Sequence, residues 1–134
     1  MVTHLSEPLW PKSSIRLEDK HRPSKTSNST LSFYRGPEPD NMAEFGDGTH
    51  TDGGTLTLLY CDQLATQVEL PWGKKWAWVE PKPGHAIVNV GDSLQALSGG
   101  RIHSPRHRVS LPAERYEEVL YFLRPEHGTS LTAL

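Results

Sequence analysis

Short apolar runs, separated by glycine and proline, follow one another from Leu31 almost to the end of this chain of 134 residues. The runs are TLSFYRG, TLTLLYC, TQVEL, WAWVE, AIVNVG, HRVSL and EEVLYFL. They are rich in β-branched, aliphatic and aromatic residues and too short for amphipathic helices, which is typical of strands. Seven or eight strands at such close spacing, with no long helical period between them, predict an all-β fold of antiparallel sandwich or barrel type.

The segments around these runs predict the domain organisation. Residues 1–30 are polar and interrupted by proline, and they predict an irregular lead-in, extended or short-helical. Residues 31–126 are expected to form the folded domain, and residues 127–134 a C-terminal tail. Inside the domain, DSLQALSGG predicts one helical turn that begins with Asp92 as its N-cap and ends at Gly99 and Gly100.

Charge and composition narrow the classes of partner. Lys and Arg number 14 against 16 Asp and Glu, so the chain has no cationic field of the kind that binds phosphate backbones. The single Cys61 rules out an internal disulfide. No apolar run is long enough to span a bilayer or to serve as a signal peptide. We therefore expect a cytoplasmic protein with neither nucleic acid nor membrane as its partner.

Four of the seven histidines lie in polar flanks or just before a strand, where a surface or structural role is the ordinary one: His4, His21, His85 and His127. His50 and His107 instead stand beside strand ends, and Asp52 follows His50 in the glycine-rich stretch GDGTHTDGG. Because side chains alternate along an extended backbone, His-x-Asp places both groups on one side. This pair is a candidate for binding one ion, although a polar loop with capping residues is the simpler alternative.

His107 lies on a strand that is distant in the sequence. It would complete a set of two imidazoles and one carboxylate on one face of a metal ion. This facial triad leaves coordination positions open on Fe(II) for a chelating cosubstrate and for oxygen. Imidazole and carboxylate also suit Zn(II) and other divalent ions. Taken alone, the three residues predict a metal site and leave the identity of the metal open.

From about Leu31 to Glu126 the chain resembles the isopenicillin-N-synthase-like, 2-oxoglutarate and Fe(II)-dependent dioxygenases, particularly their fungal members. The resemblance rests on an ordered series of motifs: HTDGGTLTLLYCDQ, WVEPKPGHAIVNVGDSLQALSGGRIHSPRHRVSLP and YFLRPE. It implies that His50, Asp52 and His107 are the iron ligands, with His107 chosen over His103 because it is the histidine of HRV. It also implies a double-stranded β-helix, or jelly roll, which agrees with the strand pattern.

Relatives in this family are normally much longer and carry N-terminal helices that brace the sheet. The resemblance therefore implies that this chain is the catalytic core, with residues 1–30 as a remnant of that region. We expect the uncovered surface to form an exposed apolar patch on one outer face of the jelly roll, with a tendency to self-associate.

Two departures from the family's pattern concern the cosubstrate. Relatives bind 2-oxoglutarate through Arg-x-Ser on the last strand, whereas ERYEEVLYFLRPE offers Arg115 with a glutamate in place of the serine. Counting back by twos from Phe122 puts Leu120 and Glu118 on the inward face. Arg115 then faces outward unless a β-bulge intervenes. Gly36 stands where relatives often carry a tyrosine, so we expect 2-oxoglutarate to be the cosubstrate but to bind weakly.

The resemblance implies an oxidoreductase that uses molecular oxygen to oxidise a small organic substrate, such as a secondary metabolite, and releases succinate and carbon dioxide. The alternative is a truncated, catalytically weak or silent member of the fold that acts as a metal-binding or interaction module. In such enzymes loops and the N-terminal region hold the substrate, so the sequence leaves its identity open.

Overall fold

The computed structural model describes residues 17–21, 29–35, 47–73, 75–109 and 117–132. Its elements are η1 (Leu17–Lys20), β1 (Thr30–Arg35), β2 (Asp47–His50), β3 (Leu56–Cys61), β4 (Thr66–Glu69), β5 (Trp76–Trp78), β6 (Ile87–Val90), α2 (Asp92–Leu97), β7 (His107–Val109) and β8 (Glu117–Leu123). The predicted all-β fold is confirmed, and β2 adds a strand that the apolar runs did not show.

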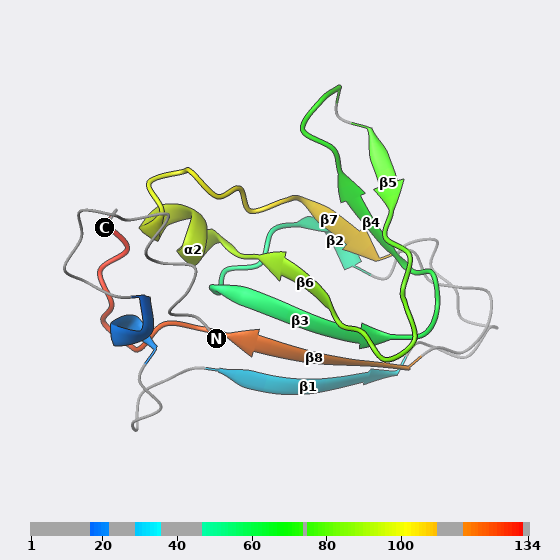
Figure 1. The fold of residues 1–134 in the computed structure, drawn as a ribbon, viewed down its shortest axis with the longest axis horizontal. Coiled ribbons are helices and arrows are strands. Elements are labelled where there is room, and N and C mark those ends of the chain that lie inside the picture. The colour runs from blue at the N-terminus through cyan, green and yellow to red at the C-terminus, as the bar shows by residue number, and fades with distance from the viewer. Residues whose placement is uncertain (1–16, 22–28, 36–46, 74, 110–116, 133–134) are drawn as a thin grey trace.

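Two four-stranded antiparallel sheets form, in the orders β1-β8-β3-β6 and β2-β7-β4-β5. Figure 1 shows them as two layers, with α2 at one end and the β4–β5 hairpin projecting from the body. The chain passes repeatedly from one sheet to the other, because β1, β3, β6 and β8 belong to the first sheet and the strands between them to the second. This alternation is the expected double-stranded β-helix.

The register of β3 and β8 determines which side chains face the space between the sheets. Thr57 lies opposite Phe122, Leu59 opposite Leu120, and Cys61 opposite Glu118. Directly opposed residues of antiparallel strands share one face of the sheet. The residues of β8 predicted to point inward, namely Glu118, Leu120 and Phe122, do line the interior cavity.

Helix α2 closes one end of the space between the sheets. Leu94 and Leu97 are buried and pack with Leu56, Val90 and Ile102. The N-cap is Gly91 and not the predicted Asp92, which is the first residue of the helix. The helix ends as predicted, since Gly99 and Gly100 both have positive φ angles, 62° and 78°, which favour glycine.

Part of the lead-in contacts the domain. The backbone N–H of Glu126 donates to the carbonyl of Lys20 over 2.9 Å. His21 forms a hydrogen bond of 2.6 Å with the buried hydroxyl of Thr55. Helix η1 is therefore held near the start of β3 and the end of β8. None of the helices in these described segments has the length and apolar character needed to cross a membrane.

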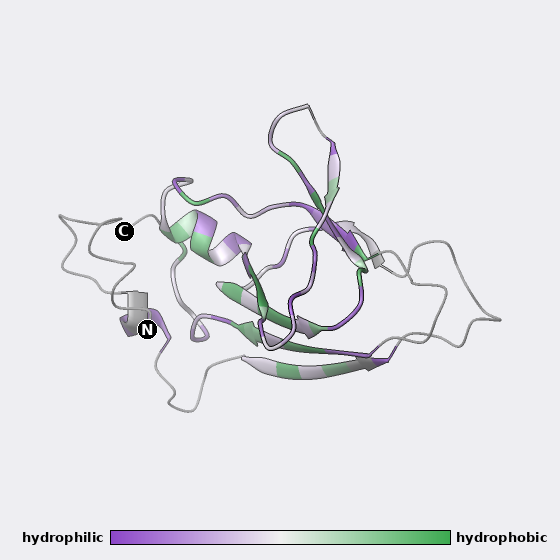
Figure 2. Cartoon of the chain, turned by 45° about the vertical axis from the view of Figure 1, so that its right-hand side comes forward, coloured by the Kyte–Doolittle hydropathy of each residue, from purple (hydrophilic) through white to green (hydrophobic). Residues whose placement is uncertain are grey.

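The outward face of the first sheet carries the predicted exposed apolar patch. Its members, here called the outer apolar face, are Leu31, Phe33, Tyr60, Val88 and Tyr121. Leu31 lies directly opposite Tyr121, and Phe33 and Tyr60 lie on either side of Val119. Phe33 is 76% exposed. Alternate green and pale bands along β1 in Figure 2 show the hydrophobic and polar residues of this edge strand.

Candidate metal centre

The pairing of β2 with β7 brings the two candidate histidines together. His50, the last residue of β2, lies opposite His107, the first residue of β7. Their ring centroids are 4.4 Å apart and the rings are tilted by 58°. Asp52 follows His50 by two residues, so the extended backbone directs its carboxylate to the same side.

The three predicted residues converge on one point. Asp52 Oδ1 lies 3.7 Å from His50 Nε2 and 3.6 Å from His107 Nε2. One ligand atom from each residue lies within 4.8 Å of the other two. Asp52 and His107 are largely enclosed, with side chains 9% and 15% exposed, whereas His50 is 41% exposed. The group is thus anchored on one side and accessible on the other.

Backbone carbonyl groups fix the tautomers of both histidines. His50 Nδ1 donates to the carbonyl of Gly48 over 2.7 Å, and His107 Nδ1 donates to that of Pro105 over 3.3 Å. A carbonyl oxygen can only accept, so in the neutral rings Nδ1 carries the proton and Nε2 keeps its lone pair. Both lone pairs are therefore available toward Asp52 and a shared ion.

Two donors orient the carboxylate of Asp52. Its Oδ2 accepts hydrogen bonds from Thr57 Oγ1 over 2.5 Å and from Asn89 Nδ2 over 2.8 Å. These bonds compensate for the burial of the charge and leave Oδ1 directed toward the histidines. The site therefore offers two imidazole nitrogens and one carboxylate oxygen, a donor set that fits Fe(II).

The loop that carries Asp52 is held against the start of α2. The backbone N–H of Asp92 donates to the carbonyl of Asp52 over 2.7 Å, and Ser93 N–H donates to the carbonyl of Gly54 over 3.0 Å. The side chain of Asp92 accepts from Thr51 Oγ1 over 3.0 Å. Gly91 is required at this contact, because a Cβ there would overlap the carbonyl of Gly54.

A cavity of about 380 Å³ opens next to the triad, between the two sheets. Aliphatic side chains form much of its wall, among them Leu59, Val68, Val79, Ile87, Val109 and Leu120. His103 also lines the cavity but does not belong to the three-residue group. A cavity of this size and character suits a small organic molecule.

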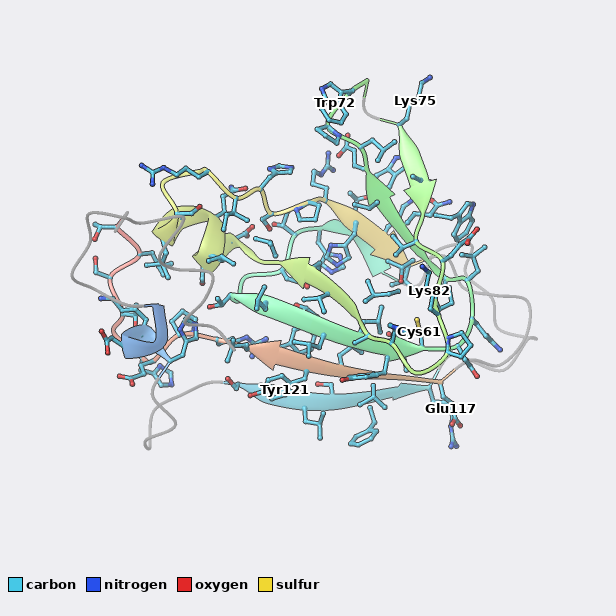
Figure 3. The ribbon with its side chains drawn as sticks, viewed as in Figure 1. Cys61, Trp72, Lys75, Lys82, Glu117 and Tyr121 are labelled. Atoms are coloured by element: carbon cyan, nitrogen blue, oxygen red, sulfur yellow. The ribbon has the colours of Figure 1, made fainter. Side chains whose placement is uncertain are left out.

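The two glutamates at the start of β8 face opposite ways. Glu118 is buried and lines the cavity. Glu117 points outward (Figure 3), where its carboxylate forms an ion pair of 2.9 Å with Arg35. Burial raises the pKa of the Cys61 thiol, and the charges of Glu118 and Asp62 raise it further. Arg115 and Gly36, singled out for the cosubstrate, lie outside the described residues.

Sequence reasoning predicted the three converging residues but missed Thr57 and Asn89. Thr57 is a polar residue in an apolar strand, an odd number of positions from Asp52. Because a turn lies between the two residues, strand alternation does not predict that their side chains meet. Asn89 is the first residue of NVGD, within the longest of the motifs that carry the resemblance. A polar residue at an inward strand position was the available signal in both cases.

A two-histidine, one-carboxylate group inside a double-stranded β-helix is typical of mononuclear iron oxygenases. The sequence profile of the 2OG-Fe(II) oxygenase superfamily matches residues 26–125. The chain belongs to this superfamily. Fe(II) and 2-oxoglutarate are the cofactors of this superfamily.

Three relatives show the extent of the similarity. The 2-oxoglutarate-dependent dioxygenase iboH of Amanita muscaria is 43% identical, over 97% of this chain and 66% of the relative. The solved dioxygenase for auxin oxidation of rice is 27% identical with a TM-score of 0.79, over 98% of this chain and 44% of that one. A full-length Neurospora crassa protein solved in complex with alpha-KG is 27% identical with a TM-score of 0.71, over 81% of this chain and 37% of that one.

Proposed function

We propose that this chain is the core of an Fe(II)- and 2-oxoglutarate-dependent dioxygenase that oxidises a small organic molecule, such as a secondary metabolite. His50, Asp52 and His107 are the proposed iron ligands. The observation that carries the proposal is their convergence, with both Nε2 atoms within 3.7 Å of Asp52 Oδ1, at the wall of a largely apolar cavity. Because the chain spans 66% or less of the relatives described above, the activity is proposed and not assigned.

When bound, Fe(II) and 2-oxoglutarate supply oxygen activation: one oxygen atom enters the substrate and the other enters succinate as carbon dioxide leaves. The protein's own residues position the reactants. Thr57 and Asn89 occupy Asp52 Oδ2 and so favour binding through Oδ1 alone. A metal ion held by these three side chains would keep coordination positions for further ligands. The aliphatic wall would limit the contact of a bound substrate with water on the side that it covers.

The cosubstrate residue, the domain bounds and the location of the protein are proposed in the same way. Arg115 is the proposed cosubstrate residue, on the strength of the resemblance. We take residues 31–126 as the catalytic domain, 1–30 as the lead-in and 127–134 as the tail. A cytoplasmic location, self-association, and the lack of nucleic-acid or membrane partners also stay predictions.

The second candidate is a member of the fold that retains the metal but turns over slowly or not at all, acting as a metal-binding or interaction module. The observation that favours it is Glu118, whose buried carboxylate lines the cavity that the dianionic cosubstrate would enter. Like charges within such a cavity oppose one another unless one is neutralised.

Metal analysis followed by a succinate assay distinguishes the two candidates. Protein purified without added iron is analysed for bound metals, reconstituted anaerobically with Fe(II), and then supplied with 2-oxoglutarate and oxygen. A dioxygenase forms succinate at a rate that falls to background in Asp52→Ala. Stoichiometric iron without succinate identifies the silent module, and Zn(II) retained in place of iron identifies a different metalloprotein.

A further inference from the structure

His103 lies where the cavity beside the triad meets solvent, here called the mouth of the cavity. Its side chain lines the cavity, and the residue is exposed. The connection that carries it runs from α2 to β7, the strand that begins with His107 (Figure 1). His103 stands four positions before His107, so at about 3.3 Å per residue their Cα atoms are at most about 13 Å apart. One small molecule in the cavity can therefore lie beside both the triad and His103.

The backbone on both sides of His103 is fixed. The N–H of Ile102 donates to Ser98 Oγ over 3.1 Å, and the Ile102 side chain packs against the buried leucines of α2. Ser104 is 2% exposed, its N–H donates to Gln95 Oε1 over 2.7 Å, and its hydroxyl donates to a carbonyl group of β6 over 3.3 Å. A side chain on an anchored backbone keeps its place at a site, which is what selective binding requires.

The imidazole ring of His103 has no partner within the protein. In the described part of the chain it forms neither a hydrogen bond nor an ion pair. The rings of His50, His85 and His107 differ, since each donates to a backbone carbonyl. Both nitrogens of His103 are therefore available to a ligand at the mouth of the cavity.

The charge that His103 can carry has no equivalent in the cavity wall. Outside the metal group, no other lining side chain among the described residues can become a cation. An imidazole donates a hydrogen bond from one nitrogen when neutral and from both when protonated. A carboxylate beside it favours the protonated ring, because opposite charges stabilise each other. A ligand with a carboxylate would therefore find its charge partner at His103.

We propose that His103 is a specificity-determining residue that binds a carboxylate of the organic substrate at the mouth of the cavity. The substrate is then a small organic acid, and its apolar part lies along the aliphatic wall beside the triad. The proposed cosubstrate residue, Arg115, belongs to a different segment of the chain. The inference rests on the proposed function in taking the triad as the metal centre beside which this acid is oxidised.

The test uses two probes of similar shape, 3-phenylpropanoate and 3-phenylpropanamide, which differ in having a carboxylate or a neutral amide at one end. Their dissociation constants are measured by calorimetry at neutral pH on the full chain without metal, so that only side chains can bind them. Charge-assisted hydrogen bonding predicts that the acid binds at least about fivefold more tightly than the amide. Equal affinities, or tighter binding of the amide, would overturn the proposal without any variant.

Two variants and a matched control assign the preference to His103. His103→Leu removes both nitrogens, so the advantage of the acid should disappear, whereas His103→Lys retains a cation and should keep it. His85→Leu makes the same change at an exposed histidine that does not line this cavity, and it should leave the ratio unchanged. A ratio that survives His103→Leu in folded protein, checked by circular dichroism, refutes the assignment. Loss of the advantage in His103→Lys as well would indicate a packing role and also refute it.

Binding of Ni(II) and of 2-oxoglutarate separates this inference from the proposed function. His103→Leu should bind both as the parent protein does. If it weakens 2-oxoglutarate binding as much as 3-phenylpropanoate binding, His103 serves the cosubstrate and the inference is wrong. A parent protein that prefers the acid but binds no Ni(II) would count against the metal site and for the role of His103. Normal Ni(II) binding without the preference would support the metal site and refute that role.

Discussion

His50 and His107 are direct cross-strand partners, and their ring centroids lie 4.4 Å apart. Each ring is held by its Nδ1 bond to a carbonyl, and Asp52 is held by Thr57 and Asn89. Hydrogen bonds within the protein therefore orient all three donor groups. Such preorganisation lowers the cost of ordering ligands around a metal.

Asn89 is expected to support the metal site without touching the metal. Asn89→Ala leaves Asp52 Oδ2 with Thr57 as its remaining side-chain donor, so the affinity for Ni(II) should fall about tenfold to a hundredfold. Gln67→Ala is the matched control, because this amide belongs to the other sheet and bonds Arg108. Equal Ni(II) affinities for Asn89→Ala and the parent protein would show that Asn89 does not support the site.

Gly91 is expected to tolerate no side chain. Gly91→Ala forces apart the loop that carries Asp52 and the start of α2, and it should lower the free energy of unfolding by about 1–3 kcal/mol, as overpacking does. Gly53→Ala is the control, since its added Cβ would meet nothing within 4 Å. Urea denaturation measures both. A Gly91→Ala protein as stable as the control would contradict the close approach seen here.

The strand pattern and the motif series predicted the fold and the convergence of His50, Asp52 and His107. Strand alternation also predicted that Glu118 would point inward, because a period of two is geometrically rigid. The N-cap was predicted wrongly: Asp92 has the right chemistry, but a side chain at Gly91 would overlap the carbonyl of Gly54, so backbone packing decided that position. Hydrogen bonds such as Asn89 to Asp52 depend on a register between distant strands, which local sequence does not encode.

The outer apolar face is expected to promote self-association. Phe33→Lys places a charge in the middle of it and should shift the protein toward monomer in light scattering at high concentration. Trp72→Ser is the control, because Trp72 is more exposed still but lies at the tip of the β4–β5 hairpin (Figure 3). If Trp72→Ser reduces association as much as Phe33→Lys, association depends on exposed hydrophobic residues in general and not on the outer apolar face. A parent protein that stays monomeric would contradict the prediction.

The parent protein is expected to bind 2-oxoglutarate weakly, because Glu118 lines the cavity where the cosubstrate's second carboxylate is expected. Glu118→Ser removes the like charge and supplies a hydroxyl donor, so affinity should rise about tenfold. Glu117→Ser, on the outer surface, should have no effect. Micromolar binding by the parent protein together with ordinary succinate production would contradict this expectation.

Anaerobic titration with Fe(II) tests the central claim, that His50, Asp52 and His107 form one metal centre, most directly. The parent protein should bind one equivalent. His107→Ala and Asp52→Ala should each weaken binding at least about a hundredfold, since each removes a direct ligand of a three-residue site. His103→Ala should bind as the parent does, because His103 lines the cavity outside the converging group. Unchanged affinity in His107→Ala, or a loss in His103→Ala equal to that in His107→Ala, would contradict the account.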